Sequence, residues 1–537
     1  MSFAILGILV LLAVVLGVVA LVRRSSGATS SKPGDGADIL VYLILALAMG
    51  VAGFALADLA SIAFPGDRFV FDPAEELANS LAALLVSMPF VVFFWRRQAA
   101  RREMFPASAG WTVYLSIMEA VFMTGFVVTA SMFISGLLGG DSLSSWTGAV
   151  VFGAIVIFHE WAARVTPPLS DAGELRRVIG SAIGLGAASA GLAGTLAWLF
   201  EIGYEALGGV GIGLELDPWI GLVIVGAPVW WYRWRRPWDG QPGVPRVSWK
   251  VIAAVVSLGV TLAALTSLLV MAVEYVFGET APAGQHFEAS PLALALALTG
   301  AVVWALHRLR PETEPLPTQV YRYVMASIGL VATVGTLVTL TVRALDRSVI
   351  VGAGTADIMV LATVLLMGLV VWIWFDRHAT RLDETGSPAS WPRRIYTLGL
   401  GAIFGLVGAG ALITTLFILL RRLLVPDATG SILWPGSIFV YTGLATWYLL
   451  SAYFRDRASA PPVEYVAPFN VTLICSHPGP IATMFPEQAR LRVIYRDDDS
   501  GVIDDEMAAR IVEEVGTRSS IVWVDADGAR VAPVRAI

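Results

Sequence analysis

Thirteen apolar stretches follow one another along the chain from residue 2 to residue 454, separated by short polar segments. Each stretch is about long enough to cross a bilayer as a helix, because a hydrocarbon core of about 30 Å needs roughly 20 residues at 1.5 Å of rise per residue. The stretches lie near 2–22, 38–64, 76–95, 110–138, 143–162, 176–206, 217–235, 249–277, 290–307, 319–346, 354–375, 394–420 and 433–454. This pattern predicts an all-α polytopic membrane protein with about 13 transmembrane helices.

The first stretch has the length of a secretory signal but not its flanks. No basic residue precedes it, no small-residue cleavage pattern follows it, and Arg23 and Arg24 stand after it. We therefore expect residues 1–37 to form an N-terminal transmembrane anchor with its linker.

Lys and Arg residues alternate between the connections. Of the 36 in the chain, 24 lie after the odd-numbered stretches, five after the even-numbered stretches and seven beyond residue 457. Because short basic connections stay on the cytoplasmic side of the membrane, this alternation predicts that the N-terminus lies outside and the C-terminus in the cytoplasm.

After the anchor, residues 38–457 repeat a two-helix unit six times. Each unit returns through a stretch that ends in Trp with a cation beyond it, which is typical of a helix end at a membrane interface. The six residues are Trp95, Trp161, Trp231, Trp304, Trp374 and Trp447. Units of two helices all enter the membrane in the same orientation, whereas many ion-coupled transporters contain inverted repeats.

Beyond residue 457 the composition changes. Residues 458–468 form a Pro-containing linker, and residues 469–537 have the pattern of a small cytoplasmic α/β domain. Period-2 patterns and turn residues predict strands and one helix. The strands are expected near 470–475, 491–496, 519–525 and 529–534, and the helix near 503–515.

Composition supports a chain whose main solvent is lipid. Hydrophobic residues make up 56% and charged residues 15% of the chain, against about 25% charged residues in ordinary soluble domains. The bilayer is therefore the first expected partner. No basic face suits nucleic acid, and the five His residues form no helical ligand pair, so we predict no nucleic acid partner, metal or other cofactor.

Ionisable residues within apolar stretches are costly and therefore candidate functional groups. Asp58 and Glu119 lie inside the second and fourth stretches, with no cationic partner at helical spacing. They could serve a proton or cation relay. The alternative, which we favour, is that they are neutral or accept hydrogen bonds from Ser, Thr or Tyr of adjacent helices.

Three further carboxylates occupy equivalent outer ends of successive repeats. Glu201, Glu274 and Asp346 each follow the basic residue that opens their helix by 24 positions. They could form a ring that attracts cations. The favoured alternative is that the outer helix ends reach water, where a carboxylate costs little.

The tail offers one candidate ligand edge. If its first two strands are parallel, their carboxyl ends bring Cys475 and His477 near the acidic run Asp497, Asp498 and Asp499, where a ligand or hard cation could bind. The acidic run is equally typical of a solvated loop, which is the interpretation we favour. Cys475 has no evident base or orienting group for nucleophilic catalysis.

Aromatic and basic residues at helix ends carry one family resemblance. Residues Arg393 to Tyr396 enter the membrane and residues Tyr453 to Arg457 leave it. In these features the chain resembles an uncharacterised bacterial family of multi-pass membrane domains with tandem helical hairpins. The resemblance covers roughly residues 38–457 and implies a bacterial plasma membrane, but it carries no activity or site residue.

Two classes of function fit these features. The favoured class is a membrane sensor, scaffold or partner-binding protein whose domain at 469–537 contacts a cytoplasmic protein. The alternative is an ion or small-solute channel or transporter that uses the intramembrane carboxylates. An enzyme is the least supported class, because no nucleophile, metal set or phosphate loop stands out.

Overall fold

In the computed structural model the chain forms two compact units, Met1–Arg455 and Asp456–Ile537. The structure describes residues 35–64, 73–104, 109–139, 145–166, 170–235, 243–278, 281–311, 313–345, 355–384, 390–425, 430–459, 469–476, 481–485, 489–495, 503–516, 518–525 and 528–534. The first predicted stretch, 2–22, lies outside these residues.

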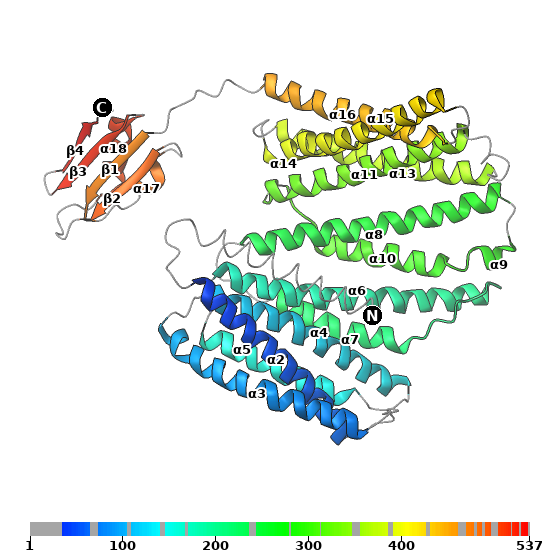
Figure 1. The fold of residues 1–537 in the computed structure, drawn as a ribbon, viewed down its shortest axis with the longest axis horizontal. Helices are drawn as coiled ribbons and strands as arrows, with labels where there is room; N and C mark the ends of the chain where they lie inside the picture. Colours follow the sequence, from blue (N-terminus) through cyan, green and yellow to red (C-terminus); the bar gives the residue numbers. More distant parts are fainter. Residues whose placement is uncertain are drawn as a thin grey trace. The chain divides into compact units, whose positions relative to one another are not determined.

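The first unit is a body of antiparallel helices (Figure 1). Its elements are α2 Asp35–Ala63, α3 Pro73–Met104, α4 Ala109–Gly139, α5 Trp146–Val165, α6 Ser170–Ala206, α7 Asp217–Arg235, α8 Val244–Phe277, α9 Ala283–His286, α10 Ser290–Leu306, α11 Pro315–Leu345, α13 Thr355–Glu384, α14 Trp391–Arg394, the π-helix η1 Ile395–Leu400, α15 Gly401–Leu424 and α16 Leu433–Ser459. In the described part of the chain, nine helices are long and apolar enough to cross a membrane. The prediction of a multi-pass helical body is therefore confirmed at this level.

Neighbouring helices approach closely where glycine replaces a side chain. In α7, α10 and α13 a glycine stands four residues before Trp: Gly226, Gly300 and Gly368. A Cβ atom at Gly226 would lie 2.5 Å from the backbone N of Ala188 on α6, and one at Gly300 would lie 2.7 Å from the carbonyl O of Ser257 on α8. These distances leave no room for a larger residue, so glycine sets the helix spacing.

The partner helices α6 and α11 carry matching glycines. A Cβ atom at Gly184 would lie 2.4 Å from the backbone N of Trp230, and one at Gly329 would lie 2.5 Å from the backbone N of Trp372. The hairpins α6–α7 and α11–α13 therefore share one packing geometry.

Aromatic cores fill the two ends of the body. Tyr42, Trp111, Tyr114 and Phe122 are buried where α2 and α4 meet. A second cluster joins α11, α13, α15 and α16. Its buried members are Tyr323, Ala326, Leu330, Val334, Ala379, Tyr396, Phe404, Ala445 and Leu449.

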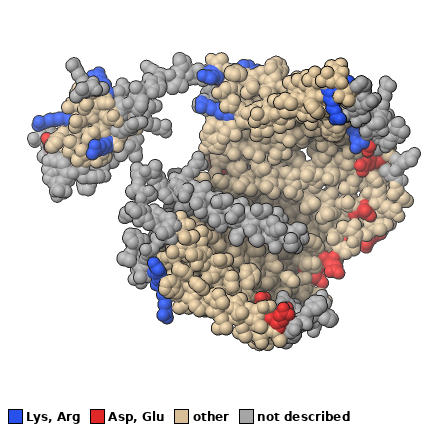
Figure 2. Space-filling view, in the orientation of Figure 1, with Lys and Arg blue, Asp and Glu red and all other residues tan. Residues whose placement is uncertain are grey.

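Charged side chains separate along the helical body. Figure 2 shows Asp and Glu side chains gathered along one edge, and Lys and Arg side chains mostly at the opposite helix ends. Not all basic residues lie at those ends. Arg343 lies in the last turn of α11, and Arg421 and Arg422 lie in the last turn of α15.

The second unit is a four-stranded sheet with two helices. Its elements are β1 Phe469–Cys475, α17 Ile481–Met484, β2 Ala489–Tyr495, α18 Asp505–Val515, β3 Ser520–Asp525 and β4 Gly528–Pro533, in sheet order β2-β1-β3-β4. β1 is parallel to β2 and β3, and β4 is antiparallel to β3. The predicted helix and all four strands are confirmed to within two residues at each end, whereas the short α17 was not predicted.

Helix α18 is defined at both ends by its sequence. The Asp504 side chain accepts a hydrogen bond of 2.8 Å from the Met507 N–H, which caps the first turn. Gly516 ends the helix at a φ of 57°, a conformation that favours glycine. The buried face of α18, with Ala508 and Ile511, covers one side of the sheet.

Candidate functional site

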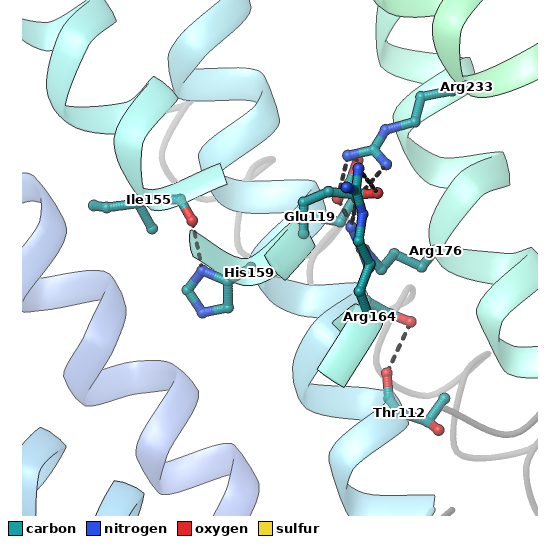
Figure 3. Close-up of polar contacts among 9 residues, drawn as sticks. Thr112, Glu119, Ile155, His159, Arg164, Arg176 and Arg233 are labelled. Carbon is teal, nitrogen blue, oxygen red and sulfur yellow. Dashed lines mark hydrogen bonds and ion pairs between the residues drawn. The ribbon is translucent and has the colours of Figure 1, made fainter. Parts of the chain in front are cut away.

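Four charged side chains from four helices form a buried cluster, and three of them, Glu119, Arg176 and Arg233, are labelled in Figure 3. Glu119 of α4 accepts hydrogen bonds from Arg176 of α6 at 3.1 Å and from Arg233 of α7 at 3.0 Å, both at Oε2. Glu160 of α5 accepts hydrogen bonds from the same two guanidiniums, at 2.7 Å from Arg233. Each carboxylate is therefore bridged by both cations, and the four charges sum to zero. We call these four residues the charge cluster.

The charge cluster is shielded from its surroundings. The side chains of Glu119, Arg176 and Arg233 are 2%, 8% and 5% exposed, and that of Glu160 is 16% exposed. Glu119 Oε1 also lies 2.7 Å from Arg233 Nη2, although not along a hydrogen-bonding direction. Removal of one member of such a group leaves an uncompensated buried charge, which typically costs about 3–5 kcal/mol.

The local sequence makes room for these side chains. A Cβ atom at Gly180 would lie 2.5 Å from Glu119 Oε1 and 3.1 Å from Arg233 Nε, so a larger residue there would displace the side chains of the charge cluster. Glu160 and Arg233 stand near the ends of α5 and α7, and Arg176 stands near the start of α6. The charge cluster thus lies toward the helix ends for which the sequence predicts the cytoplasmic side.

A buried histidine and tyrosine lie beside the charge cluster. His159 Nδ1 is 2.8 Å from the carbonyl O of Ile155, which can only accept, so Nδ1 carries the proton. His159 Nε2 is 2.7 Å from the Tyr114 hydroxyl and, in the neutral ring, accepts its hydrogen bond. Both groups are thereby satisfied by the protein.

The expectation for Glu119 was wrong. The sequence favoured a neutral side chain, or hydrogen bonds from Ser, Thr or Tyr, but the partners of Glu119 are two arginines. They stand 57 and 114 positions away on other helices, so no spacing within α4 could reveal them. The sequence did not predict a role for Glu160 for the same reason. The only indication was a carboxylate among apolar residues, four positions before Arg164.

The other predicted carboxylates of the body lie in separate settings. Asp58 is exposed on α2 and lines a cavity described below. Glu201 is 4% exposed and accepts hydrogen bonds from the backbone N–H groups of Gly213 and Leu214, at 2.7 and 3.1 Å. The favoured expectation that Glu201 reaches water was therefore wrong, because it holds the loop that follows α6.

Of the other two carboxylates in the predicted outer ring, Glu274 is half-buried near the end of α8. Asp346 lies outside the described residues, so the ring remains a prediction.

The parallel pairing of β1 and β2, on which the ligand edge of the tail depended, is observed. Cys475 is fully buried in the core beneath α18, and burial raises the pKa of its thiol, which disfavours the reactive thiolate. His477, Asp497, Asp498 and Asp499 lie outside the described residues. In the part of the chain that the structure describes, no group of three or more His, Cys, Asp or Glu residues is placed to hold a metal ion.

The sheet of the second unit presents an apolar face on the side opposite α18. Ile474 of β1 pairs with Ile494 of β2 and with Trp523 of β3, and Ile521 lies two residues before Trp523 on the same side. Ile494, Ile521 and Trp523 are 41%, 41% and 45% exposed. We call Ile474, Ile494, Ile521 and Trp523 the open sheet face; the sequence analysis did not identify it.

A second polar cluster, also not predicted, joins α13, the π-helix and α16. The Tyr448 hydroxyl donates to Asp376 Oδ2 at 2.9 Å, and Trp372 Nε1 donates to the Tyr396 hydroxyl at 3.2 Å. Tyr396 and Tyr448 both interact with Asp376. Asp376 was overlooked because it stands among the charged residues that follow an apolar stretch.

Comparison with known proteins identifies two similar regions within the chain. Residues 38–161 and 319–445 each match the family model Domain of unknown function (DUF5671). The first match runs from α2 into α5, and the second runs from α11 into α16. The predicted resemblance to an uncharacterised domain family is confirmed, although α6 to α10 lie between the two matches. No curated protein and no solved structure matches the chain.

Proposed function

We propose that this protein is a membrane scaffold of the bacterial plasma membrane that presents a partner-binding domain to the cytoplasm. In this proposal, residues 2–22 form the anchor, six hairpins in residues 38–457 bring the total to 13 spans, and the N-terminus lies outside. Residues 469–537 then recruit a cytoplasmic protein. A topology reporter fused after Arg457 is expected to be active only in the cytoplasm.

The open sheet face is the observation that carries this proposal. One side of the small sheet is covered by α18, whereas the other exposes Trp523 between apolar neighbours. Exposed Arg492 and Arg530 pair with Thr472 and Trp523 across the strands and border the apolar row. An aromatic anchor with a polar rim is the usual composition of a protein-binding surface.

The helical body favours a scaffold function over a transport function. In the described residues, Glu119 is neutralised by two arginines, Glu201 binds backbone amides and Asp58 lies in a mostly apolar cavity. A transport path would need such carboxylates to face one wet passage.

Site-specific photo-crosslinking in cells tests the partner-binding role with the full-length protein. A photoreactive residue at Ile521 or Trp523 is expected to give a discrete adduct with a cytoplasmic protein. The same residue at Glu513, exposed on α18, is the matched control and is expected to give none. Equal adducts from Glu513, or none from either sheet position, would contradict the proposal.

Reconstitution tests the alternative function of ion or small-solute transport. Purified protein in liposomes is expected to give no proton or ion flux above that of protein-free vesicles. Flux that disappears in both Asp58→Asn and Glu119→Gln, with each variant verified as folded, would replace the scaffold with a transporter.

A further inference from the structure

Helices α2, α3 and α4 enclose a cavity of about 620 Å³ in the first unit. Its walls are mostly apolar, with Leu47 and Phe54 on α2 and Ile117 and Val121 on α4. Leu47 and Phe54 are 71% and 48% exposed, so the cavity opens sideways from the helical body. We call it the α2–α4 groove. Its volume is within the range of ligand-binding pockets, about 300–1,000 Å³.

The shape of the groove suits one extended hydrocarbon chain. Its lining on α2 runs from Leu43 to Asp58, a length of roughly 22 Å at 1.5 Å per residue. A groove of this length with mostly apolar walls accommodates an extended alkyl chain.

Polar side chains are confined to one end of the groove. Asp58 of α2 and Asn79 and Ser80 of α3 line the cavity near the end of α2 and the start of α3. A carboxylate beside an amide and a hydroxyl complements an ammonium group, which is both a cation and a hydrogen-bond donor. The groove thus combines a long apolar wall with a polar end that carries a carboxyl group.

We propose that the α2–α4 groove binds one acyl chain of a membrane phospholipid whose head group carries a primary ammonium. The lipid enters sideways from the bilayer, because the groove opens at helix faces that lie within the apolar spans. Asp58 then holds the ammonium at the polar end. This site is independent of the open sheet face, and its test does not depend on the partner-binding role.

Gly50 provides a way to fill the groove without disturbing the helices. It lines the cavity, and a Cβ atom there would meet nothing within 4 Å. Gly50→Leu therefore places a side chain in the groove. Gly259→Leu is the matched control, because Gly259 of α8 is also open and lies outside this cavity. Ala83→Leu fills the groove from α3 if the first variant is unstable.

The experiment uses the full-length protein in liposomes that contain an ethanolamine phospholipid with a photoreactive group in its acyl chain. We expect crosslinks on the peptides of α2 and α4 that line the groove. Gly50→Leu or Ala83→Leu is expected to reduce them at least threefold, and Gly259→Leu to leave them unchanged. A smaller reduction in folded groove variants, or no crosslinks to these peptides, would overturn the proposal.

The head group is tested by replacement of ethanolamine with glycerol in the probe. The wild-type protein is expected to crosslink the ethanolamine probe at least threefold more than the glycerol probe, and Asp58→Asn to remove that preference. Equal labelling by both probes in the wild-type protein would show that the groove accepts an acyl chain without ammonium recognition, contrary to the proposal.

Discussion

The two regions that match the same domain family share a framework but differ in how they are held to the rest of the body. In residues 38–161, Tyr42 of the first helix packs on Tyr114 of the third, with ring centroids 5.9 Å apart. In residues 319–445, Tyr323 packs on Tyr396 at 5.0 Å. A buried Phe follows eight residues after Tyr114 and after Tyr396.

The difference lies five residues after the tyrosine of the third helix, where the first region has Glu119 and the second has Gly401. Glu119 binds arginines of α6 and α7, which follow the first region. Gly401 instead lies against Leu449 of α16, the helix in which the second match ends. At this position the framework is thus joined by charge to additional helices in the first region and packed against α16 in the second.

The largest effect is expected when one member of the charge cluster loses its charge. Glu119→Gln leaves two buried guanidiniums with one carboxylate, so we expect the free energy of unfolding to fall by about 3–5 kcal/mol. Titration with a denaturing detergent in mixed micelles measures this change. The double variant Glu119→Gln with Arg233→Gln is expected to lose less than the sum of the two single variants, because the second change removes the uncompensated charge.

Glu205→Gln is the control for Glu119→Gln, since Glu205 is exposed on α6. It is expected to change the free energy of unfolding by less than about 0.5 kcal/mol. A loss in Glu119→Gln as small as that of the control would mean that the charge cluster does not hold the two parts together.

The next largest effect is expected at the glycine contacts within the hairpins α6–α7 and α11–α13. Gly184→Ala and Gly329→Ala each place a Cβ atom against a Trp backbone N, and both are expected to destabilise the protein by about 1–3 kcal/mol. Gly186→Ala and Gly335→Ala on the same helices meet nothing within 4 Å and are expected to be neutral or stabilising. The same micelle titration measures all four, and equal effects at tight and open positions would refute a shared packing geometry.

The sequence predicted the helices of the body and the strands of the tail because both are encoded by local periodicity and turn residues. It could not predict the charge cluster, because Glu119 meets Arg176 and Arg233 only after four helices pack. The α2–α4 groove was equally hidden, since a cavity depends on how far helices stand apart. The glycine four residues before Trp was visible in the sequence, but its contact with the facing helix was not.

A smaller effect tests the hydrogen bonds of Tyr114 and of Tyr448, which interacts with the same Asp376 as Tyr396. Tyr114→Phe removes the hydrogen bond to His159, and Tyr448→Phe removes the one to Asp376. Hydrogen bonds between membrane helices contribute about 0.6 kcal/mol on average and up to about 1.7 kcal/mol. We expect both variants to lose stability within this range by the same titration. A loss in only one of the two variants would show that the two hydrogen bonds do not contribute comparably to stability.

The smallest expected effect marks the edge of the charge cluster. Arg164 lies 3.5 Å from Glu160, but its side chain is 58% exposed, so water competes for both charges. Arg164→Ala is therefore expected to lower the free energy of unfolding by less than about 1 kcal/mol, whereas Arg176→Ala, which removes a buried partner of the same carboxylate, costs several times more. Comparable losses in the two variants would mean that burial does not determine how strongly the charge cluster stabilises the protein. The contrast between the charged position of the first region and the closely packed position of the second would then need another explanation.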